Sequence, residues 1–130
     1  MNTRTVMTIA AVIALVFALG LILMPAFMGT LYGTGTSPNQ LLLARLFGSA
    51  LLGFGLINWL ARDSDYATLR PIILGNLVGD LVGLIVCVMG TLGGVMNSMG
   101  WLSVALYLLL ALGFAYLYFM GQPVNVRQRA

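Results

Sequence analysis

The chain has 130 residues, of which 61% are hydrophobic and 7% are charged, and its mean hydropathy is +1.04. About a quarter of the residues of a soluble domain are charged, so this composition excludes a soluble globular surface and predicts a protein embedded in lipid. The net charge of +3 is too small and too scattered along the chain to indicate a nucleic-acid partner. Histidine is absent, which removes the commonest ligand of haem iron, zinc and copper, so neither a metal site nor a cofactor is predicted.

Four apolar runs are long enough to cross a bilayer whose apolar core is about 30 Å thick. They cover residues 6–28, 40–61, 71–90 and 101–120. Met24, Pro25 and Gly29 are expected to end the first run, and Pro71 is expected in the first turn of the third helix. The first run is longer than the core of a secretory signal, so we expect an uncleaved helix. The predicted fold is all-α: one domain over 1–130, a four-helix transmembrane bundle running up-down-up-down.

The arginines outside the spans predict the orientation. Arg4 precedes the first span, Arg62 and Arg70 bracket the loop between the second and third, and Arg127 and Arg129 follow the fourth. The remaining two loops, 29–39 and 91–100, contain no charged residue. The positive-inside rule then places both termini and the middle loop in the cytoplasm of a multi-pass protein of the bacterial inner (plasma) membrane.

Small residues recur at four-residue spacing in every span. The third span contains Gly75, Gly79 and Gly83, and the second contains the pairs Ala44 with Gly48 and Ser49 with Gly53. Because lipid provides no hydrophobic force between helices, their association depends on close backbone contact, which small residues permit. We expect these glycines to pack helices within one chain, with contact between two copies as the alternative.

Asp80 lies near the middle of the third span, where a charged side chain on an isolated helix costs about 3 kcal/mol. Protonation, pairing with a cation or contact with a water-filled cavity would relieve that cost. Arg45 is the one arginine inside a span, and its offset from Asp80 along the bilayer normal, about 9 Å, is within reach of the two side chains. Asn76 lies one turn from Asp80 and Tyr107 lies at similar depth, so these four residues are predicted to form a polar cluster.

Two roles remain open for this cluster. Interhelical hydrogen bonds between such residues commonly hold membrane helices together and do nothing else. Ionisable residues inside a membrane also mark sites for ions, protons or small ligands. No catalytic residue is predicted, since the chain has no histidine for a triad and no second acid inside the spans to work with Asp80.

The stretch from Ala44 to Gly55, the residues Trp59 to Arg62 and the Gly100-Trp101-Leu102 start of the fourth span resemble small bacterial four-helix membrane proteins of the DoxX-like group. The resemblance implies a four-helix bundle and, for some members of the group, a role as subunit of a quinone-linked oxidoreductase. No residues of an active site can be carried over from it.

The sequence thus favours a non-catalytic accessory or structural subunit, which packs its helices against a second copy of itself or a larger membrane complex. The alternative is binding or transport of a small apolar or ionic ligand (a quinone, a carotenoid, a lipid, a proton or an ion) at a polar site formed by Asp80 and Arg45.

Overall fold

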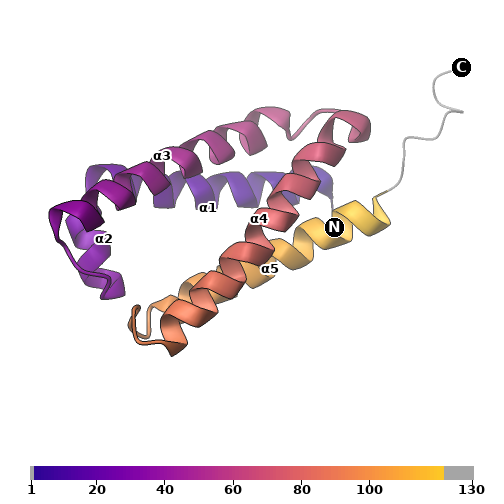
Figure 1. The fold of residues 1–130 in the computed structure, drawn as a ribbon. Helices are drawn as coiled ribbons and strands as arrows, with labels where there is room; N and C mark the ends of the chain where they lie inside the picture. Colours follow the sequence, from indigo (N-terminus) through magenta and orange to yellow (C-terminus); the bar gives the residue numbers. More distant parts are fainter. Residues whose placement is uncertain (1, 122–130) are drawn as a thin grey trace, which may run out of the picture.

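The structure, a computed structural model, describes residues 2–121 (Figure 1). Over that range it contains five α-helices and no strand: α1 (Thr3–Leu23), α2 (Pro25–Tyr32), α3 (Pro38–Ala61), α4 (Tyr66–Leu92) and α5 (Gly100–Met120). All but α2 are long and apolar enough to cross a membrane, which indicates a multi-pass membrane protein and confirms the predicted all-α class. Arg127 and Arg129, on which the predicted orientation partly rests, lie outside the described residues.

Side-chain caps are present at the starts of α1, α3 and α4. The Asn2 side chain accepts a hydrogen bond from the backbone N–H of Arg4 at the start of α1. Ser37 and Gln40 form a reciprocal capping box at the start of α3. Such caps satisfy amide groups that the first helical turn leaves without a partner.

The start of α4 differs from the prediction. Asp65 caps this helix by accepting a hydrogen bond from the N–H of Thr68 at 2.8 Å, so α4 begins at Tyr66. Pro71 therefore lies inside the helix, one turn beyond the position expected for it. The cap at Asp65 adds a turn ahead of the proline, and this overrides the preference of proline for the first helical position.

The first predicted span is divided into two helices. Because Pro25 has no N–H and its ring would clash with a carbonyl of the preceding turn, α1 ends at Leu23. Met24, at φ −130° and ψ 54°, redirects the chain into α2, which extends through residues expected to form a loop. Figure 1 shows α2 turned away from the axis of α1, and Gly33 ends it in the left-handed conformation at φ 70°.

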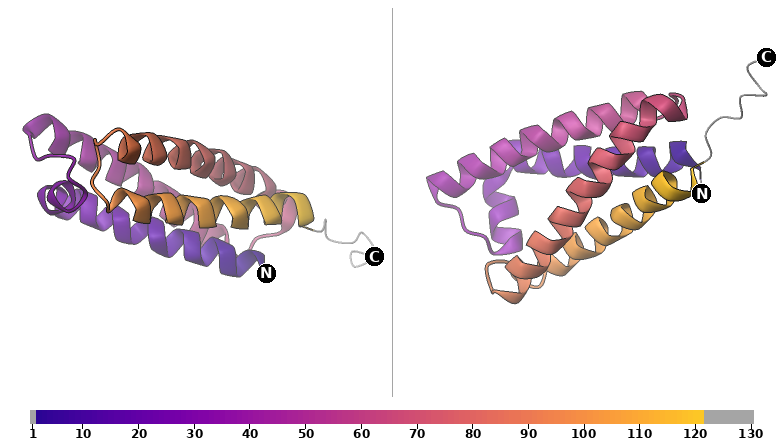
Figure 2. Two further views of the ribbon diagram at one scale, coloured as in Figure 1. Left: turned by 90° about the horizontal axis from the view of Figure 1, so that it is seen from below. Right: turned by 45° about the vertical axis from the view of Figure 1, so that its right-hand side comes forward.

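The long helices form two pairs: α1 packs along α3, and α4 packs along α5 (Figures 1 and 2). Gly48 and Gly55 let α3 approach α1 closely. A Cβ at Gly48 would lie 2.9 Å from Ile22 Cγ1, and one at Gly55 would lie 2.7 Å from Leu15 Cγ. In contrast, α3 and α4 diverge from the short turn that connects them.

The two pairs meet at one end of the molecule, here called the joined end. Its apolar core consists of Val6, Met7 and Ala10 of α1, Leu69, Ile73 and Leu77 of α4, and Ala111, Phe114 and Leu117 of α5. Nearby, the Tyr66 hydroxyl donates to the carbonyl oxygens of Leu117 and Tyr118, both at 3.2 Å. This core fixes α1 against the α4–α5 pair.

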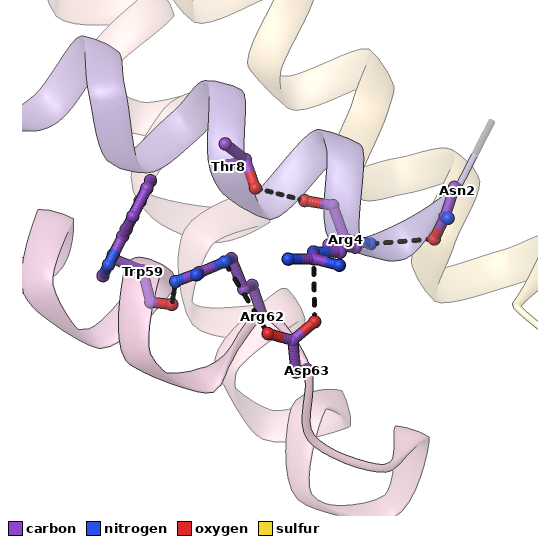
Figure 3. A network of polar contacts seen from close by, with 6 residues as sticks. All are labelled: Asn2, Arg4, Thr8, Trp59, Arg62 and Asp63. Carbon is purple, nitrogen blue, oxygen red and sulfur yellow. Dashed lines mark hydrogen bonds and ion pairs between the residues drawn. The ribbon is translucent and has the colours of Figure 1, made fainter.

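Polar contacts close the joined end at its surface (Figure 3). Asp63, in the turn between α3 and α4, pairs with Arg4 at 3.1 Å and with Arg62 at 3.7 Å. Arg62 also donates to the Trp59 carbonyl, and its guanidinium carbon lies 3.9 Å from the centroid of the Trp59 ring. The start of α1 and the end of α3 therefore lie at the same end of the molecule.

Candidate functional site

A cavity of about 730 Å³ lies between the two helix pairs, and all five helices contribute to its wall. Ala10, Asn58, Asn76 and Leu110 line its inner side toward the joined end. Pockets that bind small molecules typically enclose about 300–1,000 Å³. The cavity is therefore large enough for a drug-sized molecule or for part of a lipid.

Apolar side chains make up most of the wall, including Phe17 of α1 and Phe47 and Phe54 of α3. On the side between α3 and α4, lining residues remain exposed: Phe47 is 48% exposed and Val86 is 59% exposed. Because α3 and α4 barely contact each other, the cavity opens between them toward the space that lipid would occupy.

The α2 helix covers the outer end of the cavity. Pro25, Met28 and Tyr32 of this helix line the wall. The Tyr32 carbonyl accepts a hydrogen bond from the N–H of Asn97 at 2.9 Å, and its hydroxyl accepts one from Ser103 Oγ at 3.1 Å. These bonds attach α2 to the loop between α4 and α5 and to α5 itself. The α2 helix therefore connects the two helix pairs at the end of the cavity that lies opposite the joined end.

Asp80 lies in the cavity wall and is only 9% exposed. Its Oδ2 atom is buried and has no hydrogen-bond partner among the described residues. A buried carboxyl group without a partner is rare, since desolvation without a compensating hydrogen bond costs several kcal/mol. The carboxyl group is therefore shielded from lipid, as its position in the span requires, but the described part of the chain offers Oδ2 no hydrogen-bond donor.

Arg45 does not reach Asp80. Its side chain is exposed, lies outside the cavity wall, and donates from Nε to the carbonyl of Ile22 at 3.4 Å. The break before Pro25 removes the amide donor that would otherwise serve the last turn of α1, and the positive guanidinium replaces it at the negative end of the helix dipole. The predicted Arg45–Asp80 pair is therefore wrong, because Arg45 binds the carbonyl of Ile22 instead.

Asn76 pairs with a different residue from the one expected. Asn58 and Asn76 exchange two side-chain hydrogen bonds, at 2.9 and 3.0 Å, and Asn76 Nδ2 also donates to the carbonyl of Ile72 at 2.8 Å. Asn58 is 1% exposed. This amide pair connects the last turn of α3 to α4, whereas farther from their turn the two helices lie apart. The cluster predicted from the sequence did not include Asn58.

Tyr107 lies in the wall close to Asp80, as its depth in the fourth span predicted. Its ring rests on Gly83: a Cβ at that glycine would come within 2.7 Å of Tyr107 Cζ. Cys87, one turn farther along α4, also lines the cavity. Of the four residues expected to cluster, the structure thus gathers Asp80, Asn76 and Tyr107 around the cavity and leaves Arg45 outside.

The glycines divide into two groups. Gly48 and Gly83 support close contacts within the chain, as expected. At Gly53, Gly75 and Gly79, no atom of the other described residues lies within 4 Å of the position that a Cβ would occupy, apart from the adjoining backbone of the same helix. The expectation of packing within the chain is therefore wrong for these three. Gly75 and Gly79 instead form a bare part of the cavity wall, whereas Gly53 faces away from it.

Comparisons with models of protein families, with curated proteins and with solved structures found no match to this chain. The resemblance to the DoxX-like group stays a prediction.

Proposed function

We propose that this protein binds a small, largely apolar molecule in the cavity between its two helix pairs. The observation that carries the proposal is the buried Asp80 carboxyl group, which lines a cavity of about 730 Å³ and whose Oδ2 has no hydrogen-bond partner within residues 2–121. A few polar groups in a mostly apolar pocket are typical of small-molecule sites. The ligand enters from the bilayer through the opening between α3 and α4.

The glycines provide a matched pair of variants to test this. Gly79 and Gly53 both have open space around their Cβ positions, but only Gly79 lines the cavity. Gly79→Leu fills part of the cavity, while Gly53→Leu adds the same side chain outside it. At both positions an added Cβ would meet no atom of the described neighbouring residues within 4 Å, so both variants are expected to fold.

Each variant is extracted in mild detergent from the membranes of the cells that express it and is then purified. Mass spectrometry identifies the apolar molecules that co-purify with it. We expect a molecule that the unsubstituted protein and Gly53→Leu retain in equal amount and that Gly79→Leu loses. Equal retention by all three proteins, or retention by none of them, contradicts the proposal.

A second function, that of an accessory subunit, is favoured by the other side of α3. Ser49 and Gly53 lie four residues apart, both are exposed, and none of the residues that the structure describes covers Gly53. Small residues at this spacing let a neighbouring helix approach closely. We propose that this face contacts a second copy of the chain or a larger membrane complex.

The same two variants separate the two functions. If Gly53 mediates assembly, Gly53→Leu shifts the protein to a smaller species in native electrophoresis of detergent extracts, and Gly79→Leu does not. An unchanged species for Gly53→Leu removes the assembly role, whatever the result of the ligand measurement.

We further propose that the joined end faces the cytoplasm of a bacterial inner membrane. Arg4, Arg62 and Arg70 support this: Arg4 and Arg62 share Asp63 at the joined end, and Arg70 lies near Tyr118 of α5. Single cysteines at positions 64 and 98, in a Cys87→Ser background, test it. An impermeant maleimide added to intact cells should label position 98 and spare position 64, and the reverse pattern would refute this orientation.

A further inference from the structure

We infer that the ligand of the cavity is a lipophilic amine, a molecule with an apolar chain or ring system and one protonated amino group that pairs with Asp80. This inference rests on the proposed ligand-binding function and specifies the chemical class of the ligand.

The distribution of charge around the cavity is the first argument. Asp80 is the one charged residue in the described part of the chain that lines it. Arg45 caps α1 instead, and Arg4 and Arg62 engage Asp63 at the joined end. A buried carboxylate is costly unless a cation or several donors compensate it. Because no arginine among residues 2–121 lines the cavity, a positively charged ligand is the complement that the site lacks.

The composition of the wall is the second argument. Phe17 and Phe47 lie in the cavity wall together with Asp80, and the ring of Tyr107 rests one turn from it. Aromatic faces attract cations, most strongly where water is excluded. The remaining wall is aliphatic and leads to the opening between α3 and α4, so an apolar tail can extend into lipid while the amino group stays at Asp80.

Two polar side chains in the wall have already given their donor hydrogens to protein acceptors, while the Tyr107 side chain also lines the cavity. Both amide hydrogens of Asn76 are already donated, to Asn58 and to Ile72. The Ser103 hydroxyl is donated to Tyr32. An ionised Asp80 accepts and does not donate. An amine brings donors and positive charge, so it compensates the Asp80 carboxylate, which a molecule that brings only acceptors cannot do.

Cys87 allows occupancy of the cavity to be measured. It is the single cysteine of the sequence and lies in the cavity wall, so a bound molecule slows its alkylation by a membrane-permeant maleimide. The protein is reconstituted in phosphatidylcholine vesicles, and the alkylation rate is measured with dodecylamine or dodecanol at matched concentrations in the membrane. The two probes share a chain, and at pH 7 only the amine is charged, as a lysine side chain is. A cysteine at position 109, where Leu109 is 66% exposed outside the cavity, serves as the control in a Cys87→Ser background.

We expect dodecylamine to protect Cys87 at a concentration at least tenfold lower than dodecanol, and neither probe to protect position 109. Asp80→Asn should abolish the preference for the amine, and Asp80→Glu, which keeps the charge, should preserve it. The inference is overturned if the two probes protect the unsubstituted protein equally, or if Asp80→Asn keeps the preference. In both of those cases Cys87 is still protected, so the proposed ligand-binding function is retained. Protection by neither probe overturns the inference and the proposed function together.

Discussion

The amide pair between Asn58 and Asn76 allows a quantitative test of how α3 and α4 are held together. Substituting Asn58 by Leu removes both bonds of the pair and leaves Asn76 Oδ1 without its donor. Substituting both residues by Leu removes the polar groups together. Hydrogen bonds between membrane helices average about 0.6 kcal/mol, so two bonds of 2.9 and 3.0 Å predict a coupling energy of about 1.2 kcal/mol.

A double-mutant cycle measures this coupling as the difference between the effect of the double substitution and the summed effects of the single ones. The free energy of unfolding is measured in mixed micelles by titration with sodium dodecyl sulfate, followed by circular dichroism. The double variant should be more stable than additivity predicts by about 1.2 kcal/mol. A coupling indistinguishable from zero would show that the two amides do not pair in the membrane and would refute the placement of α3 against α4.

Two further predictions concern the packing of α1. Gly48→Leu should lower the free energy of unfolding by about 1–3 kcal/mol in the same titration, because even the Cβ of the new side chain would press on Ile22. Gly79→Leu, with open space around it, should stay within about 1 kcal/mol of the unsubstituted protein, and an equal loss in both variants would contradict the assigned packing. Arg45→Met should speed amide hydrogen exchange at the start of α2, since Ile22 loses its donor, while exchange in α5 stays constant. Unchanged exchange in α2 would show that Arg45 does not hold the break in place.

Hydropathy and length predicted the helices well because the bilayer imposes its thickness on any apolar run that crosses it. The residues at which the helices begin were harder to predict from the sequence. Pro71 is a typical first-turn residue, but Asp65, five positions from the end of the expected loop, provides the stronger cap. Pro25 was correctly predicted to end the first helix. The short helix α2 that follows was not predicted, because it depends on contacts with Asn97 and Ser103, which are distant in the sequence.

The polar site was only partly predictable for a related reason. Membrane depth alone located Asp80, Asn76 and Tyr107 near one another, and depth follows from counting residues along a helix. The rotation of each helix and the choice among partners do not follow from such counting. The depth of Arg45 would have allowed a contact with Asp80. The Arg45 side chain instead lies on the side of α3 that faces α1, where it donates to the carbonyl of Ile22.

The glycines show the limit of a motif read without its surroundings. Three glycines at four-residue spacing are typical of a packed helix face, and Gly83 does receive the ring of Tyr107. Gly75 and Gly79 continue the same face but meet empty space, because α3 and α4 diverge from their turn. The sequence carries no signal for that divergence, which depends on how the apolar core of α1, α4 and α5 holds the joined end.

The most direct measurement of the central claim is an experimental structure of the protein in a lipid bilayer, determined without added ligand. The account predicts that α3 and α4 stay apart beyond the Asn58–Asn76 pair, with non-protein density that begins between them and reaches the Asp80 carboxyl group. Closure of α3 onto α4 across Gly79, with Asp80 hydrogen-bonded to another side chain of the protein, would contradict it.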